Sequence, residues 1–240
     1  MSIFTRVDKL QKNMERQETY ESRGTFKGCK ATHSVDQVFG AAAQWQPINL
    51  DTELWDYGAP FSGGMHSTRL VCAGTVTKAI GGFTLVGVAT AFLTEVFVGS
   101  LIFVNTEFNV VTAITDNLNL TVKFAWGANA AGVAYTRSNH GYVIPGNGVY
   151  QVDFAAVLSV VTDYIAIYRN QMTIPAGATV AMEVAAGPSS MLHCGCQILC
   201  NKFDFITFHV NIANAVTVTS RYAAIAGCPA SPMATIARIS

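Results

Sequence analysis

Residues 193–200, HCGCQILC, hold the densest group of chemically reactive side chains in the sequence. Histidine and cysteine side chains this close together could bind zinc or form disulfides. Zinc sites, however, usually combine two C-x2-C pairs separated by a longer stretch, and that spacing is missing here. The group consists of His193, Cys194, Cys196 and Cys200. Its three cysteines share one parity and point to the same face of a strand, so we predict reduced, metal-free core residues.

The other histidines do not suggest a reaction centre. The loop GGMHS at 63–67 could offer His66 as a base, but it leads into an apolar stretch at 68–72, and we interpret it as a connecting loop. The sequence has no phosphate-binding glycine loop, dinucleotide fingerprint, HExxH or GxSxG motif. We therefore expect a protein that is not an enzyme and that uses no cofactor.

The composition limits the partners that the protein can have. Lysine plus arginine equals aspartate plus glutamate at 15 each, which gives no basic field for a phosphate backbone, so we expect no nucleic-acid partner. Half of the residues are hydrophobic and only 12% are charged, against roughly 25% in an ordinary domain. We infer that something other than water covers part of this surface.

Two uncharged runs, residues 79–94 and 222–237, are long enough to compare with a membrane span. Glycine, threonine, serine or proline interrupts both runs, and they fall short of the roughly 20 apolar residues that a span needs. We expect no membrane insertion. The first residues, MSIFTRVDKLQKNMER, lack the apolar core of a signal peptide, so we expect no export by that route.

The N-terminal segment, residues 1–46, differs from the rest of the chain. Ile3, Val7, Leu10 and Met14 follow the a/d rhythm of a coiled coil, which predicts a short helix, and residues 21–46 read as an extended arm. Two heptads are too short to hold a helix alone in water. We expect the helix to oligomerise or to dock on another protein, and a helix folded back on its own domain is the alternative.

From residue 47 onward the sequence predicts an all-β fold. Short alternating stretches rich in valine, isoleucine, threonine and phenylalanine are separated by glycine, asparagine and proline. Residues 75–138 read as a compact small β-barrel, and alternating strands resume at YVIPGNGVYQVDF, residues 142–154. A module inserted at an exposed loop adds little closure entropy.

Four stretches are similar to the jelly roll of the tumour-necrosis-factor and complement globular-head superfamily. They are GGMHSTRLVC at 63–72, VIPGNGVYQVDF at 143–154, ILCNKFDFITFHV at 198–210 and the terminal SPMATIARIS. The resemblance implies a jelly-roll β-sandwich, built from residues 47–74 and 139–240, that forms homotrimers. It also makes Lys202 and Asp204 part of a turn between two strands, with Phe203 where the family usually has glycine.

A second resemblance is to virion proteins of tailed bacteriophages. The GGMH loop and a terminal TI-R strand are familiar there, and GVAT at 87–90, VGSLI at 98–102 and ITDNLNLTV at 114–122 resemble a small β module of phage structural proteins. This implies a virion protein, assembled in the host cytoplasm, whose partners are its own copies and other virion proteins of the capsid or tail. We favour capsid decoration or cement. A tail, baseplate or head-fibre component that binds a host-surface receptor is the alternative, and a complement-type extracellular ligand is a third reading.

The resemblance also suggests where a trimer axis lies. In residues 198–210 the core parity set by Ile198 and Cys200 continues through Ile206, Phe208 and Val210. Phe205, Thr207 and His209 then point to the opposite face, which we expect to meet the three-fold axis, since three copies would bury an otherwise exposed phenylalanine. A register slip at the Phe203 turn would exchange the two faces.

Overall fold

The structure is a computed structural model of the 240-residue chain. It describes residues 28–32, 37–39, 44–48, 50, 52–57, 70–138, 141–157, 164–170, 179–184, 191–212, 216–218 and 233–239. The helix predicted from Ile3, Val7, Leu10 and Met14 and the loop that holds His66 lie outside these residues.

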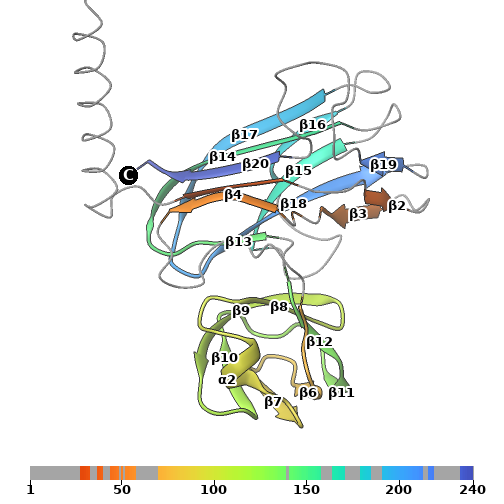
Figure 1. Cartoon of the computed structure of the whole chain (residues 1–240), viewed down its shortest axis with the longest axis vertical. Coiled ribbons are helices and arrows are strands. Elements are labelled where there is room, and N and C mark those ends of the chain that lie inside the picture. The colour runs from red at the N-terminus through yellow and green to blue at the C-terminus, as the bar shows by residue number, and fades with distance from the viewer. Residues whose placement is uncertain are drawn as a thin grey trace, which may run out of the picture.

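Two antiparallel sheets pack face to face and form a jelly-roll sandwich (Figure 1), which confirms the predicted fold class. The first sheet has the order β17-β14-β20-β1-β4 and consists of β1 (Gly28–Thr32), β4 (Thr52–Tyr57), β14 (Gly148–Val157), β17 (Met191–Cys200) and β20 (Met233–Arg238). The second has the order β13-β18-β15-β16 and consists of β13 (Gly141–Val143), β15 (Tyr164–Arg169), β16 (Thr179–Val184) and β18 (Phe205–Ile212). Strand β3 (Gln44–Pro47) also pairs with β18, and β2 (Gln37–Phe39) pairs with β19 (Val216–Val218).

Strand β1 corrects the predicted N-terminal boundary. We expected residues 21–46 to form an arm outside the jelly roll, but β1 pairs with β20 on one side and with β4 on the other. Its segment, GCKAT, is too short and too polar for a period-2 pattern to stand out in the sequence. The jelly roll therefore begins at Gly28 at the latest, before the predicted residue 47.

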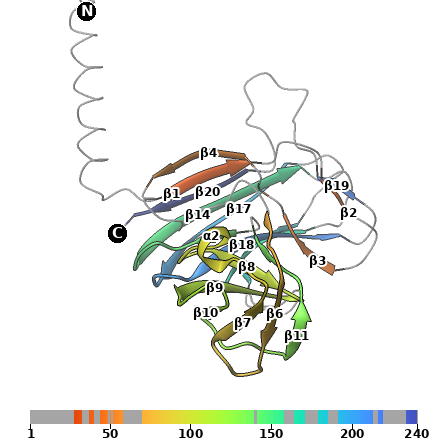
Figure 2. The same cartoon turned by 60° about the horizontal axis from the view of Figure 1, so that its bottom comes forward.

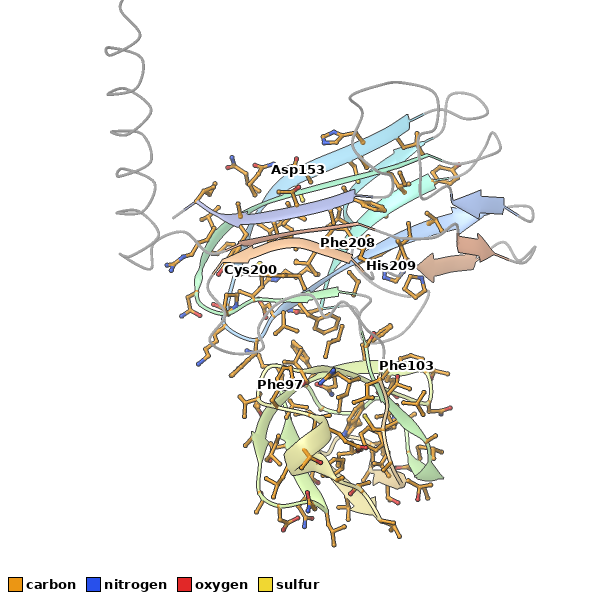
Figure 3. The ribbon with its side chains drawn as sticks, viewed as in Figure 1. Phe97, Phe103, Asp153, Cys200, Phe208 and His209 are labelled. Carbon is orange, nitrogen blue, oxygen red and sulfur yellow. The ribbon has the colours of Figure 1, made fainter. Side chains whose placement is uncertain are left out.

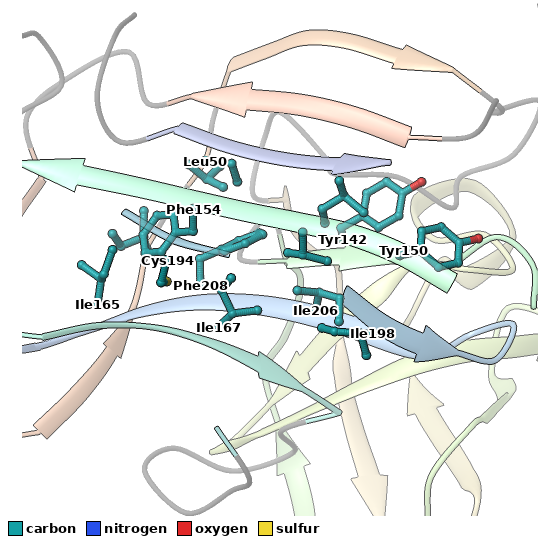
Figure 4. Close-up of a cluster of buried hydrophobic side chains, with 14 of the residues drawn as sticks. Leu50, Tyr142, Tyr150, Phe154, Ile165, Ile167, Cys194, Ile198, Ile206 and Phe208 are labelled. Atoms are coloured by element: carbon teal, nitrogen blue, oxygen red, sulfur yellow. The ribbon is translucent and has the colours of Figure 1, made fainter. Parts of the chain in front are cut away.

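The core of the sandwich comes from alternate residues of facing strands (Figure 4). Tyr150 and Phe154 point inward from β14, and Ile206 and Phe208 point inward from β18, all fully buried. The rings of Phe154 and Phe208 have centroids 5.1 Å apart. Period-2 alternation thus places one apolar side of each strand in the core, as the sequence predicted.

The inserted module is a separate antiparallel sheet that surrounds its own core. Its eight strands have the order β11-β6-β7-β10-β9-β8-β12-β5. They are β5 (Leu70–Val71), β6 (Thr75–Lys78), β7 (Thr84–Val88), β8 (Leu101–Val104), β9 (Glu107–Ile114), β10 (Asn119–Val122), β11 (Ala130–Val133) and β12 (Tyr135–Arg137), with the short helix α2 (Phe92–Glu95). Because β5 pairs with β12, the module begins at Leu70 and not at the predicted residue 75.

The module lies against one end of the sandwich, with β8 and β9 toward the jelly roll and β6 and β7 farther away (Figures 1 and 2). A small apolar cluster joins the two bodies. Leu101, Phe108 and Val110 from the module pack with Val143 and Phe205 from the jelly roll. The module is therefore packed onto the sandwich and not merely tethered to it.

Candidate interaction site

The cysteines of β17 lie on the core side of the strand. Cys194 and Cys200 are buried, and Cys196 packs against the same cluster. Burial raises the pKa of the Cys196 thiol, and it raises that of Cys200 to about 11, although nearby Arg169 opposes the second shift. The core placement predicted from their parity is confirmed, and raised pKa values leave little thiolate for nucleophilic chemistry at neutral pH.

The opposite side of β17 faces outward and forms, with β14 and β20, an open sheet face. Its residues form cross-strand rows. The first row is apolar: Leu199, 69% exposed, lies opposite Val149, whose carbonyl accepts from the N–H of Ile239. The later rows bring together Gln197, Gln151 and Ala237, and then Gly195, Asp153 and Thr235.

Asp153 gives this open face its one acidic group and shapes the strand beside it (Figure 3). Its Oδ1 accepts from Gln151 Nε2 at 3.1 Å and lies 3.8 Å from His193 Nε2. A Cβ at Gly195 would stand only 2.4 Å from the same oxygen. Glycine is therefore needed there for the carboxylate to lie across β17. This arrangement gathers a carboxylate, an imidazole, an amide and the Thr235 hydroxyl on one outward face.

The turn between β17 and β18 explains the Lys-x-Asp spacing. Asp204 is almost fully buried, and its Oδ2 accepts from Arg169 Nη2 at 2.7 Å and from the backbone N–H of Asn201 at 2.8 Å. Its Oδ1 accepts from Asn170 Nδ2 at 2.9 Å. Phe203 has φ +68, so the turn keeps the left-handed conformation that glycine usually supplies. Asp204 is thus a structural anchor of the turn.

Phe205, Thr207 and His209 point away from the sandwich core, as predicted, but none of them is exposed. The ring of Phe205 meets the ring of Phe124 from the module edge to face, with centroids 5.9 Å apart. His209 lies against the Tyr168 ring, and its Nε2 is 2.9 Å from Thr207 Oγ1. The expectation that this face is open in a single chain is wrong, because the chain itself covers it. These three residues therefore do not offer an exposed surface for the predicted three-fold axis.

The module buries a charged pair that the sequence analysis did not identify. Lys78 Nζ donates to Glu107 Oε1 at 2.8 Å, with side chains 0% and 2% exposed, and it lies 4.6 Å from the Trp126 ring centroid. Glu107 Oε2 also accepts from the N–H of Gly127 at 2.9 Å. The sequence offers little indication of this pair, because Lys78 ends a four-residue strand, TVTK. So short a pattern does not decide whether valine and lysine or the two threonines point inward.

A second acidic residue, Glu95, joins the two ends of the module. Both of its carboxylate oxygens accept from the N–H of Ala73, just after β5, at 3.0 Å. Tyr135 in β12 donates its hydroxyl proton to Oε2 at 3.2 Å, and Arg137 donates to the backbone carbonyl of Glu95 at 3.1 Å. The first and last strands of the module are therefore fastened to one helix, which closes the module on itself.

The strand order and the open face define an antiparallel β-sandwich with a β module inserted between two of its strands. No protein-family model matches the sequence, and no curated protein matches it. Among solved structures, the fold is similar to Eiger, a tumour necrosis factor of S. frugiperda. The two are 9% identical, the match covers 90% of this chain and 94% of that one, and the TM-score is 0.40. Within the described part of the chain, none of the helices has the length and apolar character to cross a membrane.

Proposed function

We propose that the protein is a non-enzymatic structural protein of a bacteriophage particle that forms a homotrimer through its jelly roll. Other virion proteins are its further partners, reached through the N-terminal segment. The observation that carries this proposal is the open face of β17, β14 and β20. The side chains of this face combine an exposed apolar row with amides, one carboxylate and one histidine.

Burial of this face in a closed oligomer accounts for its composition. Leu199 is an exposed leucine, and it lies opposite Val149 in the apolar row. Monomeric proteins rarely leave contiguous apolar patches open to water. A cyclic interface would bury the same row from every subunit at once. The sequence resemblance to trimer-forming jelly rolls supports three subunits, and the side of β18 that carries Phe205 is already covered within the chain.

The trimer is tested by substitution of Leu199. Light scattering should give three times the chain mass for the wild type and a single chain mass for Leu199→Glu, because three like charges would meet in a desolvated row. Val71→Glu is the matched control, since Val71 is 70% exposed but belongs to the module. A monomeric wild type, or a trimer that tolerates Leu199→Glu as well as Val71→Glu, would reject this assembly.

The place in the particle is tested by quantitative mass spectrometry of purified virions. Capsid decoration or cement predicts hundreds of copies per particle, whereas a tail, baseplate or head-fibre component that binds a host receptor predicts a few trimers. Removal of residues 1–24, which spares β1, should leave a folded trimer that no longer joins the particle. Full incorporation of that shortened chain would exclude docking through the N-terminal segment.

A further inference from the structure

The turn between β13 and β14 carries an Asn-Gly step. Asn147 is the one asparagine of the sequence that is followed by glycine. Its side chain is exposed, and Gly148, which opens β14, is half-buried. A Cβ built on the preceding Gly146 would meet no atom within 4 Å beyond its chain neighbours, so the turn has room to change its conformation. Water and a backbone free to move are therefore both present at this asparagine.

The carboxamide of Asn147 is held by the turn between β17 and β18. Its Oδ1 accepts from the backbone N–H of Lys202 at 2.7 Å. The main chains of the two turns are joined as well, since the Phe203 N–H donates to the Ile144 carbonyl at 2.8 Å and the Ile144 N–H donates to the Asp204 carbonyl at 2.7 Å. The fold thus fixes the Lys202 N–H in place against the side-chain carbonyl of Asn147.

The position of this donor matters for the chemistry of the amide. A carbonyl that accepts a hydrogen bond has a more electron-poor carbon, which here is Cγ of Asn147. When a nucleophile adds to that carbon, negative charge develops on Oδ1, and a preorganised N–H that already contacts this oxygen stabilises the charge. The Gly148 nitrogen is the nucleophile within reach, because it can close a succinimide ring with Cγ and no Cβ shields it.

We propose that Asn147 is a self-modifying site, at which the turn slowly converts asparagine into aspartate and isoaspartate, with the Lys202 N–H as the activating group. The Gly148 nitrogen gives up its proton to solvent base and bonds to Cγ of Asn147. The carboxamide nitrogen leaves Cγ as ammonia, with a proton from water, and a succinimide remains. Water then adds to one of the two ring carbonyls and breaks its bond to the Gly148 nitrogen, which takes up a proton. The net reaction consumes one water and releases one ammonia, without an oxidant or a reductant.

The two products change the turn differently. Opening of the ring at Cγ gives aspartate, whose carboxylate can still accept from the Lys202 N–H. Opening at the main-chain carbonyl gives isoaspartate, which lengthens the main chain by one carbon just before β14. The first pairs of β14 with β17 are Gly148 with Cys200 and Val149 with Leu199. The isoaspartate form should therefore disturb the start of this ladder, whether or not the open face beside it forms a trimer.

Mass spectrometry of the full chain, incubated at physiological temperature, tests this inference. The tryptic peptide 138–169 should become about 1 Da heavier with time, as an amide turns into a carboxylate, and fragmentation should place aspartate and isoaspartate at position 147. Because the attacking nitrogen must lose its proton, the conversion should speed up with pH. Asn201 is the internal control: it is exposed in the neighbouring turn, but the lysine that follows it hinders the backbone nitrogen. An Asn147 that keeps its mass, or that converts no faster than Asn201, would overturn the proposal.

Two matched variants test the role assigned to the Lys202 N–H. Phe203 has φ +68 and the Asp204 N–H donates to the Asn201 carbonyl at 3.0 Å, as in a type II turn, where proline is common at the position that Lys202 holds. Lys202→Pro should therefore keep the turn, remove the N–H and slow the conversion severalfold, whereas Lys202→Ala keeps the N–H and should convert as the wild type does. A conversion that is unchanged or faster in Lys202→Pro would overturn this role. If circular dichroism shows that the proline variant is misfolded, Gly148→Ala, which shields the attacking nitrogen, should slow the conversion severalfold, and an unchanged rate there would overturn the proposal.

Discussion

The jelly roll and the inserted module place their polar and apolar side chains in opposite ways. In β17 and β14 of the jelly roll, phenylalanine, tyrosine and cysteine point inward, while His193, Gln197 and Asp153 point outward. In β6 and β7 of the module, Lys78 points inward and Val86 and Val88 point outward. Valines that face water contribute no burial energy, and a lysine that is buried must be paired to offset its desolvation. The exposed valines of the module therefore point to a surface used for contact.

The ion pair of the jelly roll, Arg169–Asp204, and that of the module, Lys78–Glu107, also differ in burial. Asp204 of the jelly roll pairs with an arginine whose side chain is about one-third exposed, whereas both members of the Lys78–Glu107 pair are buried. Water can replace a lost partner in the first pair but not in the second. The cost of breaking an ion pair should therefore be larger in the module, although the module has the smaller core.

The largest expected effect separates the two cores. Phe208→Glu should prevent folding of the jelly roll, because loss of the ring costs about 3 to 5 kcal/mol and the buried carboxylate adds several more, against a total stability of about 5 to 15. Phe205→Glu should disrupt only the junction with the module, since Glu95 and the β5–β12 pair close the module on itself. Circular dichroism and limited proteolysis should show two folded parts with a cleavable junction. Complete unfolding of the Phe205 variant would mean that the two bodies share one cooperative core.

Next in size is the buried pair of the module. Lys78→Met should lower the free energy of unfolding by about 3 to 5 kcal/mol, because Glu107 is left charged and buried without its partner. Lys78→Met together with Glu107→Met should recover much of that loss, since a well-packed apolar pair of similar volume is often neutral or stabilising. Urea denaturation measures both. Lys123→Met is the control: Lys123 is half-buried and donates to the Lys202 carbonyl, and its loss should cost less than about 1 kcal/mol. Equal effects of the two single variants would remove the contrast between the regions.

The strands that alternate over five or more residues could be predicted from the sequence. β14, β17 and β18 do so, and the parity of Cys194, Cys200, Ile206 and Phe208 gave the correct core side. β1 could not be found, because a five-residue strand with lysine and glycine is fixed by its neighbours β20 and β4 and not by its own pattern. Tertiary pairing overrides local propensity in such segments.

The candidate sites show where parity stops being sufficient. Parity placed Phe205, Thr207 and His209 together on one side of β18, but it carries no information about what covers that side. Here Phe124 of the module contacts Phe205, and Tyr168 of β15 contacts His209. The open face of β17 was not identified from the sequence, because its apolar row is completed by Val149 of β14 and by Ile239, which follows β20. Long-range covering of a face has no signature in the local sequence.

A smaller effect is expected at the turn of the jelly roll. Asp204→Asn should cost about 1.5 to 3 kcal/mol, because the amide keeps the geometry but loses the charge-assisted bond to Arg169 and cannot accept from every donor around it. Arg169→Gln should cost less than about 1 kcal/mol, since the arginine is partly hydrated and Asp204 keeps its bonds to Asn170 and Asn201. Thermal unfolding of both variants measures the difference. A larger loss for the arginine variant would show that this pair behaves like the buried pair of the module.

The smallest effect concerns the thiol of Cys200 and depends on pH. Cys200→Ala should cost about 1 kcal/mol near pH 7, the usual order for a small change of buried volume. Burial raises the pKa of this thiol to about 11, from the ordinary value near 9 that it regains on unfolding. The neutral thiol therefore stabilises the folded state fully below pH 9, and this contribution is lost as the pH rises toward 11, because only the unfolded chain releases the proton in that window. The stability difference between the wild type and Cys200→Ala should shrink over the same interval, since alanine cannot ionise. Urea denaturation of both proteins from pH 7 to 10.5 measures this difference, and the comparison cancels the lysines and tyrosines that titrate in both. A stability difference between the two proteins that stays constant or grows with pH would mean that the thiol is hydrated in the folded protein. Water would then reach the core side of β17.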